Sequence, residues 1–187
     1  TFDKPQIREI AAGIGLKVAD KPDSQDICFV PDGDYLSFLK NRCQMDLKPG
    51  PFVDAEGKVI GTHKGICAVT IGQRKGLNLA IGKPAYVTEI RPDTNEVVIG
   101  DNADLFKKRL RASCVNFMSE KSPEIGRKYQ AKIRYNHKPA LCIIENCEDN
   151  NMTLLFDMPQ RAITPGQSVV LYDGEYILAG GIIENAE

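Results

Sequence analysis

The chain has 187 residues, of which 42% are hydrophobic and 26% charged, so it has room for one large globular domain or two small ones. Its apolar runs are much shorter than the roughly 18 residues of a membrane span, and it has no signal peptide, so we expect a cytoplasmic protein without a membrane partner. The net charge of −1 argues against a uniformly basic nucleic-acid binder. The sequence starts at Thr1, not at a methionine, and leads straight into a predicted helix, so we expect a piece of a larger protein.

The N-terminal part is predicted to hold two helices separated by a loop. Asp3, with Gln6 three residues later, is typical of a helix start, and the glycines at 13 and 15 are typical of its end. Its apolar face comprises Ile7, Ile10, Ala11 and Ile14. A polar, proline-containing loop is expected over most of 21–31, followed by a second short helix. We expect the buried side of that helix to be Tyr35, Leu36, Phe38 and Leu39.

Beyond residue 50 the apolar pattern changes to that of short strands. One hairpin is predicted with strands at 52–53 and 59–60, a further strand at 66–71, and a second hairpin with strands at 85–91 and 96–99. Six more strands are predicted at 109–117, 128–135, 140–146, 152–156, 168–172 and 176–183. Regularly spaced short strands with hardly any helix favour a small closed barrel.

These elements predict an α+β fold with a short helical N-terminal segment, a small central α+β domain and a C-terminal all-β barrel of about six strands. We expect the three domains to span 1–40, 41–106 and 107–187.

Cysteine and histidine are the residue types that could form a disulfide or hold a metal. They are Cys28, Cys43, Cys67, Cys114, Cys142, Cys147, His63 and His137. A chain of this size without a signal peptide is expected to keep its thiols reduced. No two cysteines have Cys-x-x-Cys spacing, and neither histidine lies in a ligand pattern, so we expect no metal site.

Positive charge is concentrated in one stretch. Residues 107–138 contain ten lysines or arginines and two glutamates, whereas residues 139–187 contain one arginine and eight acidic residues. This asymmetry could reflect an exposed rim at a domain junction or a stripe that follows a phosphate backbone. Within it, Arg134-Tyr135 pairs a planar cation with an aromatic ring, which suits an unstacked RNA base, although a tyrosine in a strand is commonly a core residue.

Three further positions are candidates for chemistry or binding. Cys28, between Ile27 and Phe29, is either a small core residue or a nucleophile that carries sulfur. Arg74 and Lys75, flanked by glycines at 72 and 76, form either a solvated turn or a phosphate contact. Gln167, beside a Pro-Gly turn, is either solvated or a contact to a base or sugar edge.

Four segments in order resemble the tRNA-specific 2-thiouridylase family. They are Lys-Pro-Asp-Ser-Gln-Asp-Ile-Cys-Phe at 21–29, Thr-Ile-Gly-Gln-Arg-Lys-Gly-Leu at 70–77, Ile-Arg-Tyr at 133–135 and Thr-Pro-Gly-Gln at 164–167. The match at 70–77 is the most specific, and the resemblance runs over essentially the whole chain. It implies that 1–40 is the end of a catalytic domain.

The resemblance implies a sulfurtransferase that places sulfur at C2 of the wobble uridine of tRNA. In such an enzyme ATP adenylates the uridine, and Cys28 receives a persulfide from a donor protein and delivers the sulfur. A cysteine on the ATP-binding domain then forms a transient disulfide with Cys28. Arg134, Tyr135 and Gln167 fall on positions that contact tRNA.

The sequence departs from the family in lacking the Ser-Gly-Gly-x-Asp-Ser loop that holds the pyrophosphate of ATP, and the second cysteine of that domain. We therefore expect ATP to be bound mainly by a missing N-terminal domain and this chain alone to be inactive. A non-catalytic RNA-binding module, with Cys28 merely packed, is the alternative.

Overall fold

The structure is a computed structural model that describes residues 2–21, 30, 34–42, 44, 47–118 and 123–187. The chain divides into two compact units, Thr1–Asp46 and Leu47–Glu187. In the described residues, no helix has both the length and the apolar character needed to cross a membrane.

The first unit contains helices α1 (Lys4–Gly13) and α2 (Tyr35–Arg42). The predicted start of α1 is confirmed, because the Asp3 carboxylate accepts a hydrogen bond from the Gln6 amide at 3.0 Å and the Gln6 side chain accepts one from the Asp3 amide at 2.9 Å. Asp34 caps α2 in a similar way by accepting from the Ser37 amide at 3.0 Å.

The apolar side chains of these helices are largely exposed. None of the residues of α1 is buried, and Ile7 and Ile14 keep 53% and 69% of their surface exposed. The prediction for α2 is confirmed at Leu39, which is buried, and is wrong for Tyr35, which is exposed. Among the described residues of this unit, the buried hydrophobic ones are Ala19, Val30 and Leu39.

The second unit begins with a four-stranded sheet. Its strands are β1 (Gly50–Val53), β2 (Val59–His63), β3 (Tyr86–Arg91) and β4 (Glu96–Gly100), in the order β2-β1-β4-β3. The two predicted hairpins are confirmed as β1–β2 and β3–β4, and they join through a parallel pair between β1 and β4. Phe52, Val87 and Val97 form the centre of the small core on this sheet.

The prediction of a strand at 66–71 is wrong. Gly65 has a φ of +135°, and the chain then forms a short 3-10 helix, Ile66–Ala68. Ile66, Val69 and Ile71 are half-buried and pack over the core of the sheet from a loop. An apolar run that covers a sheet has the same composition as a strand within one, so local periodicity could not separate the two cases.

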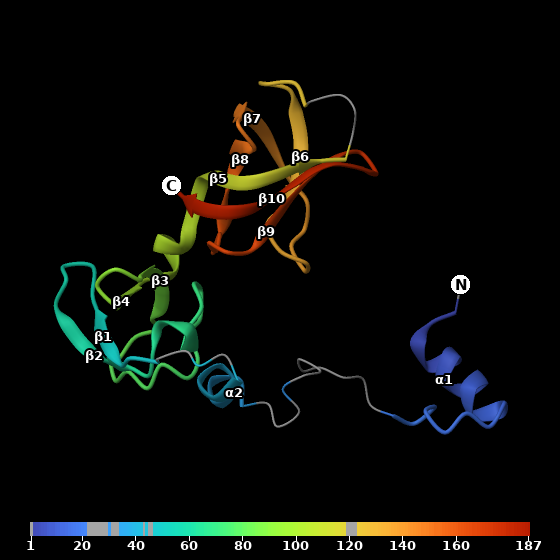
Figure 1. Cartoon of the computed structure of the whole chain (residues 1–187), viewed down its shortest axis with the longest axis horizontal. Coiled ribbons are helices and arrows are strands. Elements are labelled where there is room, and N and C mark those ends of the chain that lie inside the picture. The colour runs from blue at the N-terminus through green and yellow to red at the C-terminus, as the bar shows by residue number, and fades with distance from the viewer. Residues whose placement is uncertain (1, 22–29, 31–33, 43, 45–46, 119–122) are drawn as a thin grey trace. The chain divides into compact units, whose positions relative to one another are not determined.

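The remaining strands close into a barrel (Figure 1). They are β5 (Phe106–Phe117), β6 (Lys128–Lys132), β7 (Ala140–Glu148), β8 (Asn151–Arg161), β9 (Ser168–Asp173) and β10 (Tyr176–Ala186), in the order β10-β5-β8-β7-β6-β9. Every neighbouring pair is antiparallel. The predicted α+β fold with a six-stranded C-terminal barrel is therefore confirmed.

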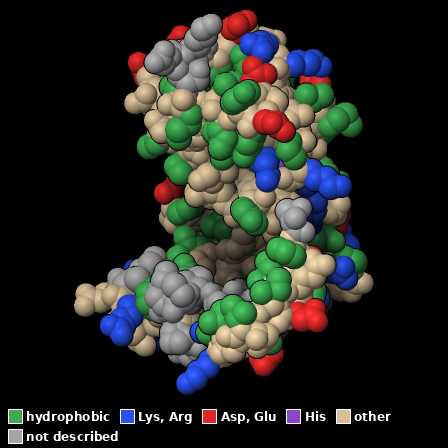
Figure 2. All heavy atoms as spheres, turned by 90° about the vertical axis from the view of Figure 1, so that its right-hand side faces the viewer, with side chains coloured by type: hydrophobic (Ala, Val, Ile, Leu, Met, Phe, Trp, Pro, Cys, Tyr) green, Lys and Arg blue, Asp and Glu red, His purple; other side chains and the backbone are tan. Residues whose placement is uncertain are grey.

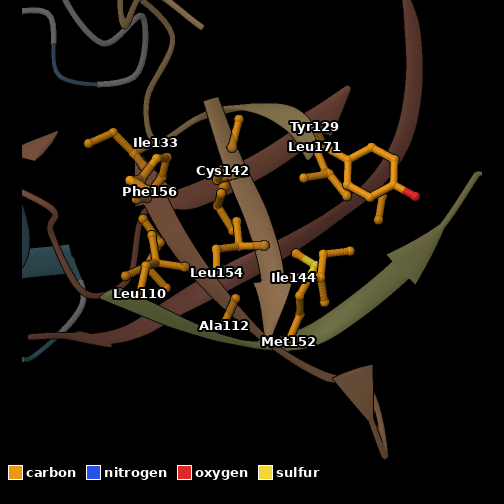
Figure 3. Close-up of a cluster of buried hydrophobic side chains, with 14 of the residues drawn as sticks. Leu110, Ala112, Tyr129, Ile133, Cys142, Ile144, Met152, Leu154, Phe156 and Leu171 are labelled. Atoms are coloured by element: carbon orange, nitrogen blue, oxygen red, sulfur yellow. The ribbon is translucent and has the colours of Figure 1, made fainter. Parts of the chain in front are cut away.

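Side chains alternate along each strand, so that one set fills the interior of the barrel and the other points outward. Figure 3 shows the inward residues of β7 and β8, such as Ile144, Leu154 and Phe156, meeting those of β5 and β6. On β6, Tyr129 and Ala131 are buried, so Lys128, Gln130 and Lys132 lie on the outer surface. The outer face of β6 thus displays two of the predicted cations, Lys128 and Lys132.

Candidate nucleic-acid interface

A hollow of about 730 Å³ lies on the outer face of the barrel, over β6 and β9. Its lining comes from the end of β6, from the turn that follows it, and from the start of β9: Lys132, Arg134, Tyr135, Asn136, Gly166, Gln167, Ser168, Val170 and Tyr172. Three predicted site residues, Arg134, Tyr135 and Gln167, are therefore brought together, although more than thirty positions separate Tyr135 from Gln167.

Backbone hydrogen bonds hold both edges of this hollow. The His137 amide donates to the Arg134 carbonyl at 3.1 Å, which closes a tight turn immediately after Ile133. On the other edge, Gly166 adopts a φ of +83° and its amide donates to the Ile183 carbonyl at 2.8 Å, while the Ile183 amide donates to the Gln167 carbonyl at 2.8 Å. The Thr-Pro-Gly-Gln segment is a turn fixed to β10, and Gln167 is presented from a rigid support.

Tyr135 keeps 91% of its surface exposed, so the reading of this residue as part of the core is wrong. The ammonium group of Lys132 lies 5.9 Å from the centroid of its ring. An exposed ring beside Lys132 and Arg134 has the features of a platform on which an unpaired base can stack, because every base has a flat face and carries a phosphate nearby.

His137 lies just behind this turn. Its Nδ1 is buried and, within the described part of the chain, has no hydrogen-bond partner. Burial lowers the pKa of His137 below its usual value, and the charges of Arg134 and Lys132 lower it further, while the Gln160 side chain acts in the opposite direction. These surroundings therefore favour the neutral form of the His137 imidazole.

Sequence reasoning missed part of the hollow. Ser168, Val170 and Tyr172 occupy every second position of β9, between the buried Val169 and Leu171. The alternation was visible in the sequence, but the pairing of β9 with β6, in which Lys132 faces Val170, was not.

The Gly72–Gly76 turn divides into a supporting part and an exposed part. The Gly72 amide donates to the Val87 carbonyl at 2.8 Å, and the Val87 amide donates to the Gln73 carbonyl at 3.0 Å. The Gln73 side chain accepts from the Thr70 amide and donates to the Lys75 carbonyl, each at 3.0 Å. These bonds leave the Arg74 and Lys75 side chains in solvent. Arg74 lines a second hollow of about 380 Å³, which shares no residue with the one on the barrel.

Much of the predicted basic stretch is neutralised by the acidic stretch that follows it. Arg109 contacts Glu145 at 2.7 Å, Arg127 contacts Asp173 at 2.6 Å, and Lys128 contacts Asp157 at 2.7 Å. On the face shown in Figure 2, Lys and Arg side chains of the barrel accordingly stand beside Asp and Glu side chains. The cations of this stretch therefore do not all form one basic stripe. Those without an ion pair in the described structure are Lys107, Lys108, Lys132, Arg134 and Lys138.

Cys28 lies outside the described residues, and so does Cys43. The cysteines that the structure describes, Cys67, Cys114, Cys142 and Cys147, are free. Burial in the barrel core raises the pKa of the Cys142 thiol to about 12, which makes this thiol a packing group. No group of three potential metal ligands occurs among the described residues.

The fold and the hollow define a class of protein: one with a helical segment, a small β domain and a six-stranded barrel that presents cations and an aromatic ring. Family models match the three parts in the same order. They are a tRNA methyl transferase HUP domain at residues 1–32, a tRNA methyl transferase PRC-barrel domain at 36–101 and an aminomethyltransferase β-barrel domain at 107–183.

Curated relatives carry a more specific name. The chain is 51% identical over 182 residues to the tRNA-specific 2-thiouridylase MnmA of Lachnoclostridium phytofermentans, covering 97% of this chain and 51% of the relative. It is 52% identical over 185 residues to that of Carboxydothermus hydrogenoformans, covering 98% and 50%, and 49% identical over 185 residues to that of Clostridioides difficile, covering 99% and 51%. The chain belongs to the tRNA-specific 2-thiouridylase family, and it spans about half the length of the curated relatives it matches.

Proposed function

We propose that this chain is the tRNA-binding and sulfur-carrying part of an enzyme that places sulfur at C2 of the wobble uridine. One observation carries the tRNA-binding role: Arg134, Tyr135 and Gln167, which the family resemblance assigns to tRNA, line a single hollow on the barrel. The exposed Tyr135 ring can stack on a base, and the unpaired cations can contact its phosphates. The Gln167 amide can form a hydrogen bond with the edge of the base. Arg74 and Lys75 supply a second group of phosphate contacts.

The chemistry that we assign to Cys28 rests on the family resemblance and on the family names. ATP is the co-substrate, and its use converts the C2 oxygen of the uridine into a leaving group. The terminal sulfur of a Cys28 persulfide attacks C2, and AMP departs with that oxygen. A thiolate of a second cysteine then attacks the Cys28 sulfur, which leaves the new sulfur on the base and joins the two cysteines in a disulfide. A cellular thiol must reduce this disulfide before the next turnover.

Several parts of this reaction lie on other polypeptide segments or partners. The chain has no Ser-Gly-Gly-x-Asp-Ser loop, so ATP is held mainly by an N-terminal domain, and the sulfur comes from a persulfide-bearing donor protein. The exposed apolar side chains of α1 and its C-terminal cap, Ile7, Ile10 and Ile14, suit packing against that domain. The chain alone is therefore inactive, and the full reaction takes place in the cytoplasm.

The domain boundaries that go with this proposal are 1–40, 41–106 and 107–187. The first holds Cys28, the second presents Arg74 and Lys75, and the third presents the hollow.

A non-catalytic RNA-binding module remains the second candidate, because the hollow by itself provides a binding surface. The two candidates differ in the role of Cys28. If the module interpretation holds, Cys28 is packed and does not react rapidly with thiol reagents in the folded protein.

The deciding experiment uses the intact parent protein in cells that lack 2-thiouridine. We expect the wild type to restore the thiolated nucleoside in digested tRNA and Cys28→Ser to abolish it, with tRNA affinity changed by less than about twofold because the two side chains have similar shapes. Cys114→Ser, at an exposed cysteine of the barrel, is the matched control and should retain activity. Full thiolation by Cys28→Ser would exclude the persulfide role.

A further inference from the structure

Arg161 lies at the end of β8, where this strand extends beyond its pairing with β7. The β7–β8 pairing ends with Cys142 opposite Phe156, whereas Arg161 pairs with Phe106 at the beginning of β5. The next residue, Ala162, adopts a φ of +55°, and its amide donates to the Leu105 carbonyl at 2.8 Å. The strand therefore carries Arg161 to the corner where the barrel meets the four-stranded sheet.

The Arg161 guanidinium contacts two residues beside the sheet and lies close to a third. Its Nε donates to the Asn102 side chain at 3.1 Å, and its Cζ lies 5.4 Å from the centroid of the Tyr86 ring. One terminal nitrogen lies 3.6 Å from the point where a Cβ would stand on Gly72. A planar guanidinium can lie over a ring while it donates in its own plane, so one side chain holds both contacts beside the Gly72 turn.

Gly72 brings its turn unusually close to the same corner. A Cβ on Gly72 would stand 2.9 Å from the Cβ of Ala162, and the φ of +87° at this position further favours glycine. Two residues later in the turn is Arg74, and six residues after Arg161 in the chain is Gln167. The corner is therefore connected by only a few residues of chain to each of the two groups to which we assign RNA contacts.

We propose that Arg161 is a positioning residue that holds the Arg74–Lys75 turn at a fixed distance from the barrel hollow, so that one tRNA engages both surfaces at once. The inference rests on the proposed function, because it requires both surfaces to bind RNA. When two surfaces are rigidly connected, engagement of the first raises the effective concentration of the RNA at the second. Loosening the connection weakens binding without removing any contact to the RNA.

The test measures the affinity of the intact protein for tRNA in a double-mutant cycle. We expect Arg161→Ala to weaken binding about five- to tenfold, because the gain from simultaneous engagement is reduced. In a background that already carries Arg134→Ala and Tyr135→Ala, the barrel surface is disabled, and Arg161→Ala should then change affinity by less than about twofold. Equal effects in the two backgrounds would mean that Arg161 acts by general electrostatics or by direct contact, and would overturn the proposal.

Two variants separate positioning from loss of charge. Tyr86→Leu leaves every charge in place but removes the ring under Arg161, and it should reproduce the coupled loss in weaker form. Arg127→Ala removes a barrel cation that is paired with Asp173, and it should leave affinity within about twofold.

Hydrogen exchange provides a readout that does not depend on RNA. Arg161→Ala should speed amide exchange in both the 72–75 and the 161–164 segments, with protection of the barrel core unchanged. Unchanged exchange at both segments would show that the corner is held without Arg161. If instead Arg134→Ala and Arg74→Ala each leave tRNA affinity unaltered in the wild-type background, the proposed function itself fails, and exchange still decides whether Arg161 fixes the corner.

Discussion

The two histidines show that a residue type acquires a role only through its surroundings. His63 is buried, with Nδ1 accepting from the Gly65 amide at 3.1 Å and Nε2 lying 3.1 Å from the Asn95 carbonyl, so the proton resides on Nε2. Both nitrogens are satisfied by the backbone, and His63 serves the fold. His137 has an unpaired Nδ1. Its pKa is lowered in part by Arg134 and Lys132, two cations of the surface that we assign to RNA.

His137 leads to a prediction about pH. Its pKa is lowered in the folded chain, so the unfolded chain binds the proton first as the pH falls. The contribution of neutral His137 to stability is therefore complete above the unfolded pKa of about 6.5 and is lost as the pH falls below it. We expect the melting temperature of the wild type to decrease more between pH 7 and pH 5.5 than that of His137→Gln. Parallel curves for the two proteins would contradict this assignment.

At the scale of elements, single residues at the ends of strands determine how the strands meet. Gly50 begins β1 opposite His63, and a Cβ at this position would collide with the Asn95 carbonyl and stand 2.8 Å from the His63 Nε2. These atoms are held by the His63 hydrogen bond, so they cannot move aside without losing it. The packing of the start of β1 against His63 and Asn95 thus depends on the absence of one side chain.

We expect Gly50→Ala to lower the free energy of unfolding by about 1–3 kcal/mol, since overpacking forces backbone shifts. Gly180→Ala on β10 is the matched control, because a Cβ there would meet the Val169 carbonyl at an ordinary 3.5 Å. The measurement is the midpoint of chemical denaturation of both variants and the wild type. Equal midpoints for Gly50→Ala and the wild type would show that the backbone around Gly50 relaxes freely.

At the scale of the whole molecule, closure of the barrel converts a sequence-level charge asymmetry into ion pairs. Arg127 and residues on β5 and β6 supply the cations, and residues on β7, β8, β9 and β10 supply the carboxylates. The Arg109 hydrogen bond lowers the pKa of Glu145, which keeps this carboxylate charged, and the Arg109 cation is not available to RNA. The number of phosphates that the barrel can neutralise is therefore smaller than the count of lysines and arginines suggests.

Releasing a paired cation should strengthen RNA binding. Asp157→Asn removes the partner that lies 2.7 Å from Lys128, a residue on the same outer side of β6 as Lys132. We expect the slope of log affinity against log salt to become steeper by about 0.7–0.9, with little change in sequence preference. Arg134→Ala should make the slope shallower by a similar amount, and the same slope for both variants and the wild type would exclude these residues from the phosphate contacts.

The sequence by itself determined the features that depend on neighbours within a few residues. The cap of α1 at Asp3, the two hairpins and the alternation along the barrel strands follow from local hydrogen bonding and from the period of the backbone. The motif at 70–77 identified the family, and the motifs at 133–135 and 164–167 supplied three residues of the hollow, Arg134, Tyr135 and Gln167. Position 28 stays a prediction, because it lies outside the described residues.

Only the tertiary structure decided which distant residues meet. The loop at 66–71 was mistaken for a strand because covering a core and forming a strand place the same demand on composition. The neutralisation of Arg109 by Glu145, the meeting of Tyr135 with Gln167 and the contact of Arg161 with Tyr86 all join residues at least thirty positions apart. Such contacts depend on strand order and register, which set the positions of all side chains on a closed barrel and cannot be derived from any one segment.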